Sequence, residues 1–121
     1  MALGRFSVAL GNRLGFQVGR FSDWVSALDT GVEGLARAGV RLLVLDEFPY
    51  LVANSPELPS VIQALYDRRG PASGTLPFRI ILCGSSISVM STLLSGNQAL
   101  RGRAVIDMRM GPFPYRDAAA Y

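Results

Sequence analysis

The segment VRLLVLDE, residues 40–47, decides the fold class of this chain. Its apolar run over Val40–Leu45 is interrupted only by Arg41, is too short for a typical helix and does not alternate with polar residues. Such a run predicts a strand that is buried on both faces of a parallel sheet. Because the run ends in Asp46 and Glu47, two carboxylates are expected at the carboxyl end of this strand.

Two further segments extend the predicted sheet. An apolar run over Phe78–Cys83 predicts a second buried strand, and the partly alternating segment Val105–Met110 predicts a third. Strand, helix, strand, helix, strand is the order that builds a parallel sheet with right-handed crossovers. The sequence therefore predicts the α/β fold class for residues 1–121, with a parallel sheet of about three strands and flanking helices.

Apolar periodicity and capping residues place the helices around these strands. A first helix over residues 3–14 is expected to stop at Gly15, and Ser22 is expected to cap a second helix that Thr30 and Gly31 weaken, with a break there as one outcome. The other expectations are a turn over Phe48–Pro56, a helix over Glu57–Arg69, an exposed loop over Gly70–Pro77, a helix capped by Ser86, and the start of a helix at Tyr115–Tyr121.

The composition excludes several chemistries. All 12 basic residues are arginines, so the chain has neither lysine nor histidine. A Ser-His-Asp triad, a histidine-bearing metal site and a Schiff-base lysine are therefore impossible within this chain. A G-x-x-x-x-G-K-[ST] phosphate loop is excluded too, because that loop needs its lysine to reach the β- and γ-phosphates.

Charge and cysteine content set the expected surroundings. The formal net charge of +3 is spread along the sequence without a basic run, so we do not expect nucleic-acid binding by this chain. Cys83 is the only cysteine and reads as a buried small hydrophobe, which makes a reducing, cytoplasmic setting the default. The sequence shows no targeting segment and no apolar run of the roughly 20 residues that a membrane-spanning helix needs.

The candidate site residues lie at the predicted strand ends. Ligands of parallel sheets gather at the carboxyl ends of the strands. Asp46 and Glu47 follow four apolar residues, which is the Walker B pattern of nucleoside triphosphatases. One carboxylate there can hold a magnesium ion on the phosphates, and its neighbour can orient the attacking water. The alternative is a pair of acids that solubilises a strand end, which is the commoner origin of this pattern taken alone.

Two more segments carry polar groups that fit the same chemistry. Ser85 and Ser86 follow the second strand, where a hydroxyl can bond the water or the γ-phosphate, the role called sensor 1. Arg103, in the loop before the third predicted strand, has the charge that stabilises a reacting phosphate. The alternatives are an ordinary helix cap for the serines and a solvated loop position for the arginine.

Taken together, three segments resemble a known family. They are RLLVLDEFPYLVANSPELPSVIQALYDRR (41–69), RIILCGSSISVMSTLLSG (79–96) and MGPFPYRDAAAY (110–121). In this order they are similar to the archaeal-type ATPases of the AAA/STAND P-loop superfamily, prokaryotic ATP-binding proteins that often carry a nuclease-like domain after the ATPase module. The resemblance runs from about Arg5 to Tyr121. Its specificity comes from DEFPYL, CGSS and GPFPYRDA occurring together at these separations.

The resemblance implies a role for each candidate residue. Asp46 would bind Mg²⁺, Glu47 would position the hydrolytic water, and sensor 1 would be Ser85 or Ser86. The resemblance also implies a phosphate-stabilising role for Arg103, because Gly102-Arg103 fits the family pattern. Arg101, however, stands at a position that the family usually gives to an aromatic residue. ATP and Mg²⁺ would be the ligands of the complete protein.

The sequence also departs from this family. Family members begin with a strand, a glycine-rich phosphate loop ending in Lys-Ser/Thr, and a following helix and strand, and they continue into a lid. The chain contains none of these parts, so we expect an internal fragment of an ATPase domain that has little activity alone. The alternative is a non-catalytic module whose sheet pairs with itself, with an intact paralogue or with another partner that supplies strands.

Overall fold

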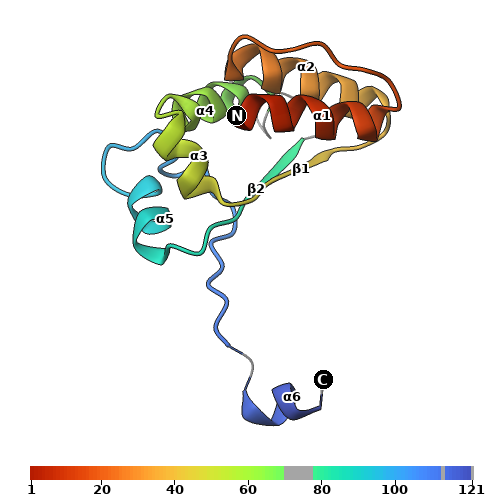
Figure 1. The fold of residues 1–121 in the computed structure, drawn as a ribbon. Helices are drawn as coiled ribbons and strands as arrows, with labels where there is room; N and C mark the ends of the chain where they lie inside the picture. Colours follow the sequence, from red (N-terminus) through yellow and green to blue (C-terminus); the bar gives the residue numbers. More distant parts are fainter. Residues whose placement is uncertain (70–77, 113, 121) are drawn as a thin grey trace.

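A computed structural model describes residues 1–69, 78–112 and 114–120 of the chain. It has a mixed α/β fold, which confirms the predicted class (Figure 1). The predicted loop over Gly70–Pro77 lies outside the described residues. The elements are α1 Ala2–Leu14, α2 Trp24–Arg37, β1 Leu42–Leu45, α3 Phe48–Asn54, α4 Leu58–Arg69, β2 Arg79–Leu82, α5 Ile87–Leu93 and α6 Tyr115–Ala119.

Helix α1 ends where the sequence predicts, and α2 differs from the prediction in two ways. Gly15 adopts the left-handed conformation that closes α1. The cap of α2 is Asp23 rather than Ser22, because the Asp23 carboxylate accepts the Ser26 backbone N–H at 2.8 Å. No break occurs at Gly31, where a side-chain Cβ would lie 2.9 Å from the Phe6 ring of α1. Packing between α1 and α2 therefore outweighs glycine's low helix propensity.

A helix replaces the turn predicted over Phe48–Pro56, so that prediction is wrong. Helix α3 begins directly after Glu47, and Pro49 stands in its first turn, where a backbone N–H has no intrahelical partner to lose. Phe48 is fully buried in the core, so tertiary packing stabilises this short helix. The predicted helix over Glu57–Arg69 is observed as α4.

Two parallel strands form the sheet. Leu42 to Leu45 of β1 pair in register with Arg79 to Leu82 of β2. Side chains alternate across a strand, so Leu43 and Leu45 share one face with Ile80 and Leu82. That face packs against a core built mainly from α2 and α4, which lie on one side of the strands (Figure 1).

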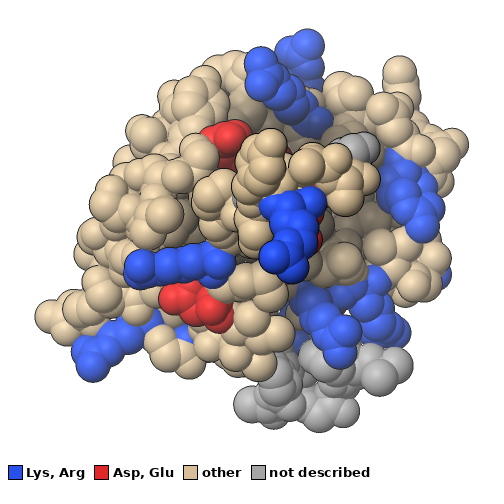
Figure 2. Space-filling view, turned by 90° about the horizontal axis from the view of Figure 1, so that it is seen from below, with Lys and Arg blue, Asp and Glu red and all other residues tan. Residues whose placement is uncertain are grey.

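The prediction that the strands are buried on both faces is wrong for this structure. On the face opposite the core, Leu42, Val44 and Ile81 are 45%, 50% and 47% exposed. The apolar run correctly indicated a parallel strand, but burial of its second face requires an element that packs there. Figure 2 views the molecule from below and shows arginines at several separate places, not gathered in one patch.

The predicted third strand at 105–110 is also wrong for this structure, because the sheet of the described residues has two strands. Val105, Ile106, Met108 and Met110 are each more than 70% exposed, and their segment runs away from the helices toward α6 (Figure 1). Alternating residues become a strand only where a neighbour supplies hydrogen bonds and packing. Alternation along the sequence does not reveal whether that neighbour is present.

Within the part of the chain that the structure describes, no helix has the length and apolar character that a membrane crossing requires.

Candidate functional site

The two strands bring the predicted site segments to one edge of the sheet. Because β1 and β2 are parallel, the segments after Leu45 and Leu82 leave the sheet at the same end. Cys83 fixes this junction: its N–H donates to the Leu45 carbonyl at 2.9 Å, and its carbonyl accepts the Phe48 N–H at 2.8 Å. Cys83 itself is half-buried, less than the sequence predicted.

Glu47 has an unusual backbone conformation. Its φ of 50° and ψ of 43° place it in the left-handed region, and it is the one non-glycine residue with positive φ in the described ranges. Its N–H donates to the Asp46 carboxylate at 2.9 Å, and both side chains are exposed to solvent. Such strain in a residue other than glycine favours a functional role. This left-handed turn interrupts the extended backbone of β1 directly after Asp46.

The strain at Glu47 makes a testable prediction. Replacing Glu47 with glycine should raise the free energy of unfolding by about 1 kcal/mol, because glycine adopts this conformation without the Cβ clash. Urea denaturation followed by circular dichroism measures the change. Glu47→Ala is the matched control, since it removes the carboxylate and keeps the Cβ. Equal stability of the two variants would show that Glu47 is not strained.

Gly84 is needed because the two site segments approach closely. A Cβ at this position would lie 2.6 Å from Cδ of Pro49 and 3.0 Å from the Met90 sulfur. Gly84 and Pro49 are 35 positions apart in the sequence, so this approach is a feature of the folded molecule. The contact holds the turn after β2 against the start of α3.

Substitution of Gly84 should therefore disturb the site edge. Gly84→Ala is expected to lower the free energy of unfolding by about 1–3 kcal/mol, because the proline ring cannot bend away as a flexible side chain would. Thermal unfolding measures the loss. Gly19→Ala is the control, since a Cβ there meets nothing within 4 Å and the backbone φ is not positive. Equal shifts of the unfolding temperature in Gly84→Ala and Gly19→Ala would contradict this contact.

The two candidate sensor residues lie between β2 and α5. Ser85 is exposed, and Ser86 is half-buried at the N-cap of α5, as predicted. Ser86 makes no side-chain cap bond; its hydroxyl lies 3.5 Å from that of Ser88. Both serines follow β2, and Asp46 follows its parallel neighbour β1. Either hydroxyl is therefore a candidate to bond a ligand at this edge of the sheet.

Arg103 has a different environment from the other candidates. Its Nε donates to Oδ1 of Asp67 on α4 and its Nη2 donates to Oδ2, each at 3.1 Å. Its Nη1 donates to the Ala99 carbonyl at 3.0 Å. The hydrogen bonds to Asp67 raise the pKa of the Arg103 guanidinium above its ordinary value. In this arrangement Arg103 attaches its loop to α4, and the structure does not join it to Asp46 and Glu47.

Asp46 and Glu47 define what metal chemistry the edge can support. Within the described residues, no group of three or more histidine, cysteine, aspartate or glutamate side chains is arranged to hold a metal ion. Magnesium does not require such a cage, because it keeps several waters and commonly uses one or two carboxylates together with substrate phosphates. The residues present therefore fit a magnesium ion that arrives with a phosphorylated ligand better than a resident metal.

Comparison with known proteins adds no further assignment. Neither a protein-family model, nor a curated protein, nor a solved structure matches this chain.

Proposed function

We propose that this chain supplies the magnesium-binding and water-positioning half of a P-loop ATPase site. Asp46 is the magnesium ligand, Glu47 orients and polarises the water, and Ser85 or Ser86 bonds the water or the γ-phosphate. Arg103 acts on the phosphate only after its ion pair with Asp67 opens. The proposal takes up the resemblance of residues 41–69, 79–96 and 110–121 to archaeal-type ATPases of the AAA/STAND superfamily, and a reducing, cytoplasmic setting goes with it.

One observation carries most of this proposal. Glu47 keeps a strained left-handed backbone at the carboxyl end of a parallel strand, directly after a second carboxylate. If these acids only solubilised the strand end, they would not need a strained backbone. An acid in an unstrained turn, with glycine at the left-handed position, would serve equally well. A strained acidic residue at the edge where parallel sheets bind ligands is better explained by a chemical task.

The same chemistry limits what the chain does alone. Triphosphate affinity in this class comes mainly from backbone N–H groups and a lysine around the phosphates. The chain has no lysine, and two carboxylates without that grip repel the nucleotide. We therefore expect the purified chain to hydrolyse ATP barely, with the phosphate-binding loop supplied by other residues. An in-frame G-x-x-x-x-G-K-[ST] in the coding DNA upstream of Met1 would identify that source.

Manganese, a paramagnetic substitute for magnesium, tests the metal role directly. We expect MnCl₂, added without nucleotide, to broaden the amide signals of Asp46, Glu47, Ser85 and Ser86 in the ¹⁵N-labelled chain. Asp46→Asn should abolish this local broadening, because an amide is a far weaker ligand for a hard cation than a carboxylate. Asp107→Asn, at an exposed acid elsewhere in the chain, is the control and should leave the broadening intact. Broadening that survives Asp46→Asn would overturn the assignment.

A second candidate function is a non-catalytic interaction module. The observation in its favour is the open face of the parallel sheet, with Leu42, Val44 and Ile81 each about half exposed. Parallel sheets are normally covered on both faces, so this apolar surface favours a partner that supplies strands or a helix. This function has three versions: self-association, pairing with an intact ATPase, and pairing with another partner that supplies strands.

Size-exclusion chromatography with light scattering distinguishes the module from a self-contained domain. A dimer that becomes monomeric in Leu42→Ser/Val44→Ser would support association through this face. Ile106→Ser is the matched control, because Ile106 is exposed but lies outside the sheet. A soluble monomer of the unmodified chain at high concentration would argue against self-association.

A further inference from the structure

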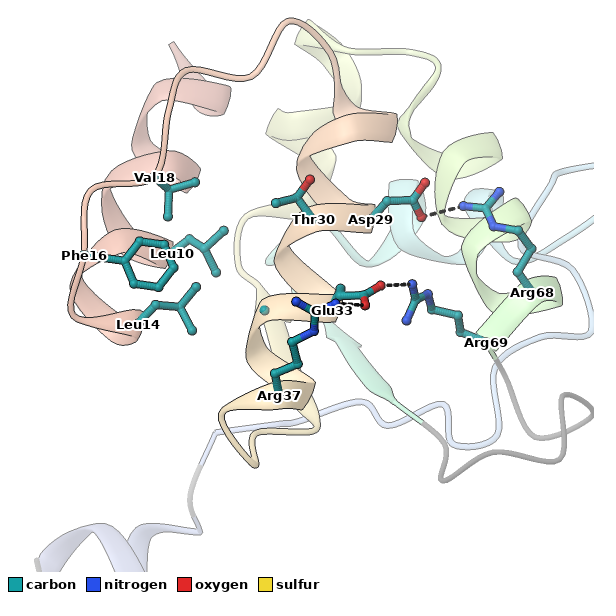
Figure 3. A pocket seen from close by; sticks show the side chains of 11 residues that line it. Leu10, Leu14, Phe16, Val18, Asp29, Thr30, Glu33, Arg37, Arg68 and Arg69 are labelled. Atoms are coloured by element: carbon teal, nitrogen blue, oxygen red, sulfur yellow. Dashed lines mark hydrogen bonds and ion pairs between the residues drawn. The ribbon is translucent and has the colours of Figure 1, made fainter.

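A cleft separate from the strand edge lies among α1, α2 and α4 (Figure 3). Its volume of about 840 Å³ falls within the roughly 300–1,000 Å³ that is usual for small-molecule sites. None of the strand-edge residues lines it. The lining residues are Leu10, Leu14, Phe16, Val18, Asp29, Thr30, Glu33, Gly34, Arg37, Arg68 and Arg69.

One side of the cleft is apolar. It consists of Leu10 and Leu14 from α1 together with Phe16 and Val18 from the segment that leads to α2. Phe16 is 62% exposed although it is a large aromatic residue. An exposed aromatic side chain on the wall of a cleft offers apolar surface that a ligand can cover.

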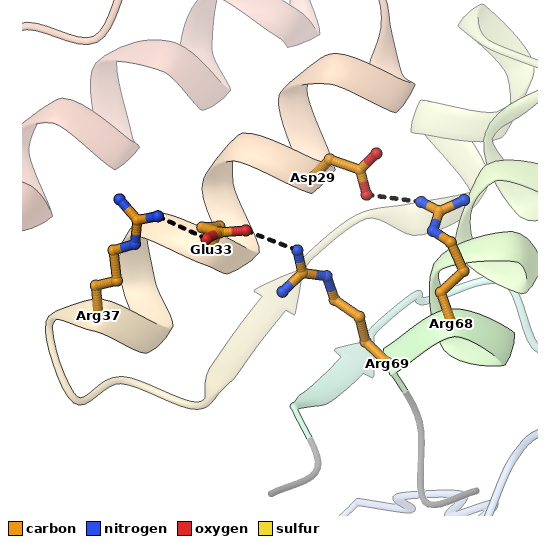
Figure 4. Close-up of polar contacts among 5 residues, drawn as sticks. All are labelled: Asp29, Glu33, Arg37, Arg68 and Arg69. Carbon is orange, nitrogen blue, oxygen red and sulfur yellow. Dashed lines mark hydrogen bonds and ion pairs between the residues drawn. The ribbon is translucent and has the colours of Figure 1, made fainter. Parts of the chain in front are cut away.

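The other side of the cleft is charged. Arg68 donates to Asp29 at 2.6 Å, and Glu33 accepts from Arg37 and from Arg69 at 2.8 Å each (Figure 4). Both Glu33 oxygens are engaged, and the hydrogen bonds from Arg69 and then Arg37 lower the pKa of this carboxyl below its ordinary value. Glu33 therefore stays ionised and holds two guanidinium groups in place.

The charges of the lining side chains do not cancel. Three arginines face two carboxylates, which leaves a formal charge of +1 in the cleft. Arg37 uses only Nη2 in its ion pair with Glu33, whereas a guanidinium has five N–H donors. In Figure 3 the Arg37 guanidinium lies between Glu33 and the apolar side of the cleft. A single negative charge placed there would meet free donors and balance the remaining positive charge.

We propose that this cleft binds a small amphipathic anion, with its apolar body against Leu14, Phe16 and Val18 and its anionic group on Arg37. Two properties of the cleft define this ligand class. Apolar side chains on one wall select an alkyl or aromatic body, and the surplus positive charge of the other wall selects a carboxylate or a phosphate. Neither a neutral alcohol nor a small inorganic anion would use both halves.

The test uses eight-carbon probes on the ¹⁵N-labelled full chain. Octanoate and octyl phosphate carry the proposed combination, octanol lacks the charge, octyltrimethylammonium inverts it, and acetate and inorganic phosphate lack the apolar body. We expect the two amphipathic anions to shift the amide signals of the cleft residues, and the tighter of the two to identify the head group. Equal binding of octanol, or shifts confined to other residues, would overturn the proposal.

Exposed residues on each side of the cleft provide variants that should still fold. Arg37→Gln and Phe16→Ser should each weaken octanoate binding by about tenfold, the effect of losing one charge-assisted contact or one apolar wall. Their matched controls are Arg5→Gln and Val8→Ser, at exposed positions of α1 that do not line the cleft. Circular dichroism confirms folding in each case. Unchanged affinity in folded Arg37→Gln would refute the anion site.

Discussion

Replacing Phe48 with alanine is expected to lower the free energy of unfolding by about 3–5 kcal/mol, the largest stability effect that we predict for a single substitution. The Phe48 side chain is fully buried, with 0% of its surface exposed, and it lies in the core cluster with residues of α2 and α4. Its removal deletes apolar contacts and leaves a cavity beneath α3. Urea denaturation followed by tryptophan fluorescence measures the loss.

Tyr50 provides the matched control for Phe48. It belongs to the same short helix, but 62% of its surface is exposed, so Tyr50→Ala should change the stability by less than about 0.5 kcal/mol. If both variants lost the same stability, helix propensity and not core packing would be stabilising α3. Because the Phe48 N–H also bonds Cys83, the loss at Phe48 should spread to the strand edge.

Glu47→Gln is expected to reduce ATP hydrolysis by about 100- to 10,000-fold, the usual contribution of a general base. This expectation rests on the proposed function and applies to the chain acting together with its phosphate-binding loop. Glutamine keeps the size and the backbone strain of glutamate but cannot accept a proton from water. Nucleotide binding should therefore persist while turnover falls, and steady-state phosphate release together with nucleotide titration separates these two quantities.

Glu57→Gln is the control for this loss of turnover. Glu57 is also exposed and lies just before α4, so its neutralisation should leave hydrolysis unchanged. Turnover that survives Glu47→Gln would contradict the assignment of the water-positioning role. Rapid hydrolysis by the purified chain alone, abolished in Glu47→Gln, would instead show that no separate phosphate-binding loop is required.

The two proposed sites can fail independently. The strand edge depends on carboxylates that follow β1, whereas the cleft depends on Arg37 and on the apolar wall after α1. Asp46→Asn should abolish manganese broadening and leave octanoate binding unchanged. Arg37→Gln should weaken octanoate binding and leave manganese broadening unchanged. A variant that altered both readouts would indicate a change in the fold.

Several elements could be predicted from the sequence because their signals are local. An apolar run of strand length marked β1 and β2, helical periodicity marked α1, α2 and α4, and Gly15 marked the end of α1. The parallel arrangement followed from the order of these elements. The parallel arrangement places Asp46 and Glu47, which follow β1, at the same edge of the sheet as Ser85 and Ser86, which follow β2. The sequence predicted these four residues at strand ends.

Other features depend on contacts between segments that are distant in the sequence. The left-handed turn at Glu47 and helix α3 depend on the burial of Phe48 and on the Cys83 bonds, and none of these is visible in the local pattern. Arg103 pairs with Asp67, 36 residues away, so its charge alone could not reveal its partner. The cleft was missed for the same reason, since Arg68 pairs with Asp29 and Arg69 with Glu33, at sequence separations of 39 and 36 residues.

The sequence by itself determined the strands β1 and β2, the helices α1, α2 and α4, and the two acids that follow β1. Only the tertiary structure decided which of those surfaces are covered. Val44 and Leu45 are adjacent apolar residues of one strand, yet Leu45 is buried in the core and Val44 is half exposed. The physical reason is that secondary structure follows from short-range periodicity and capping, whereas burial depends on which elements pack against each face.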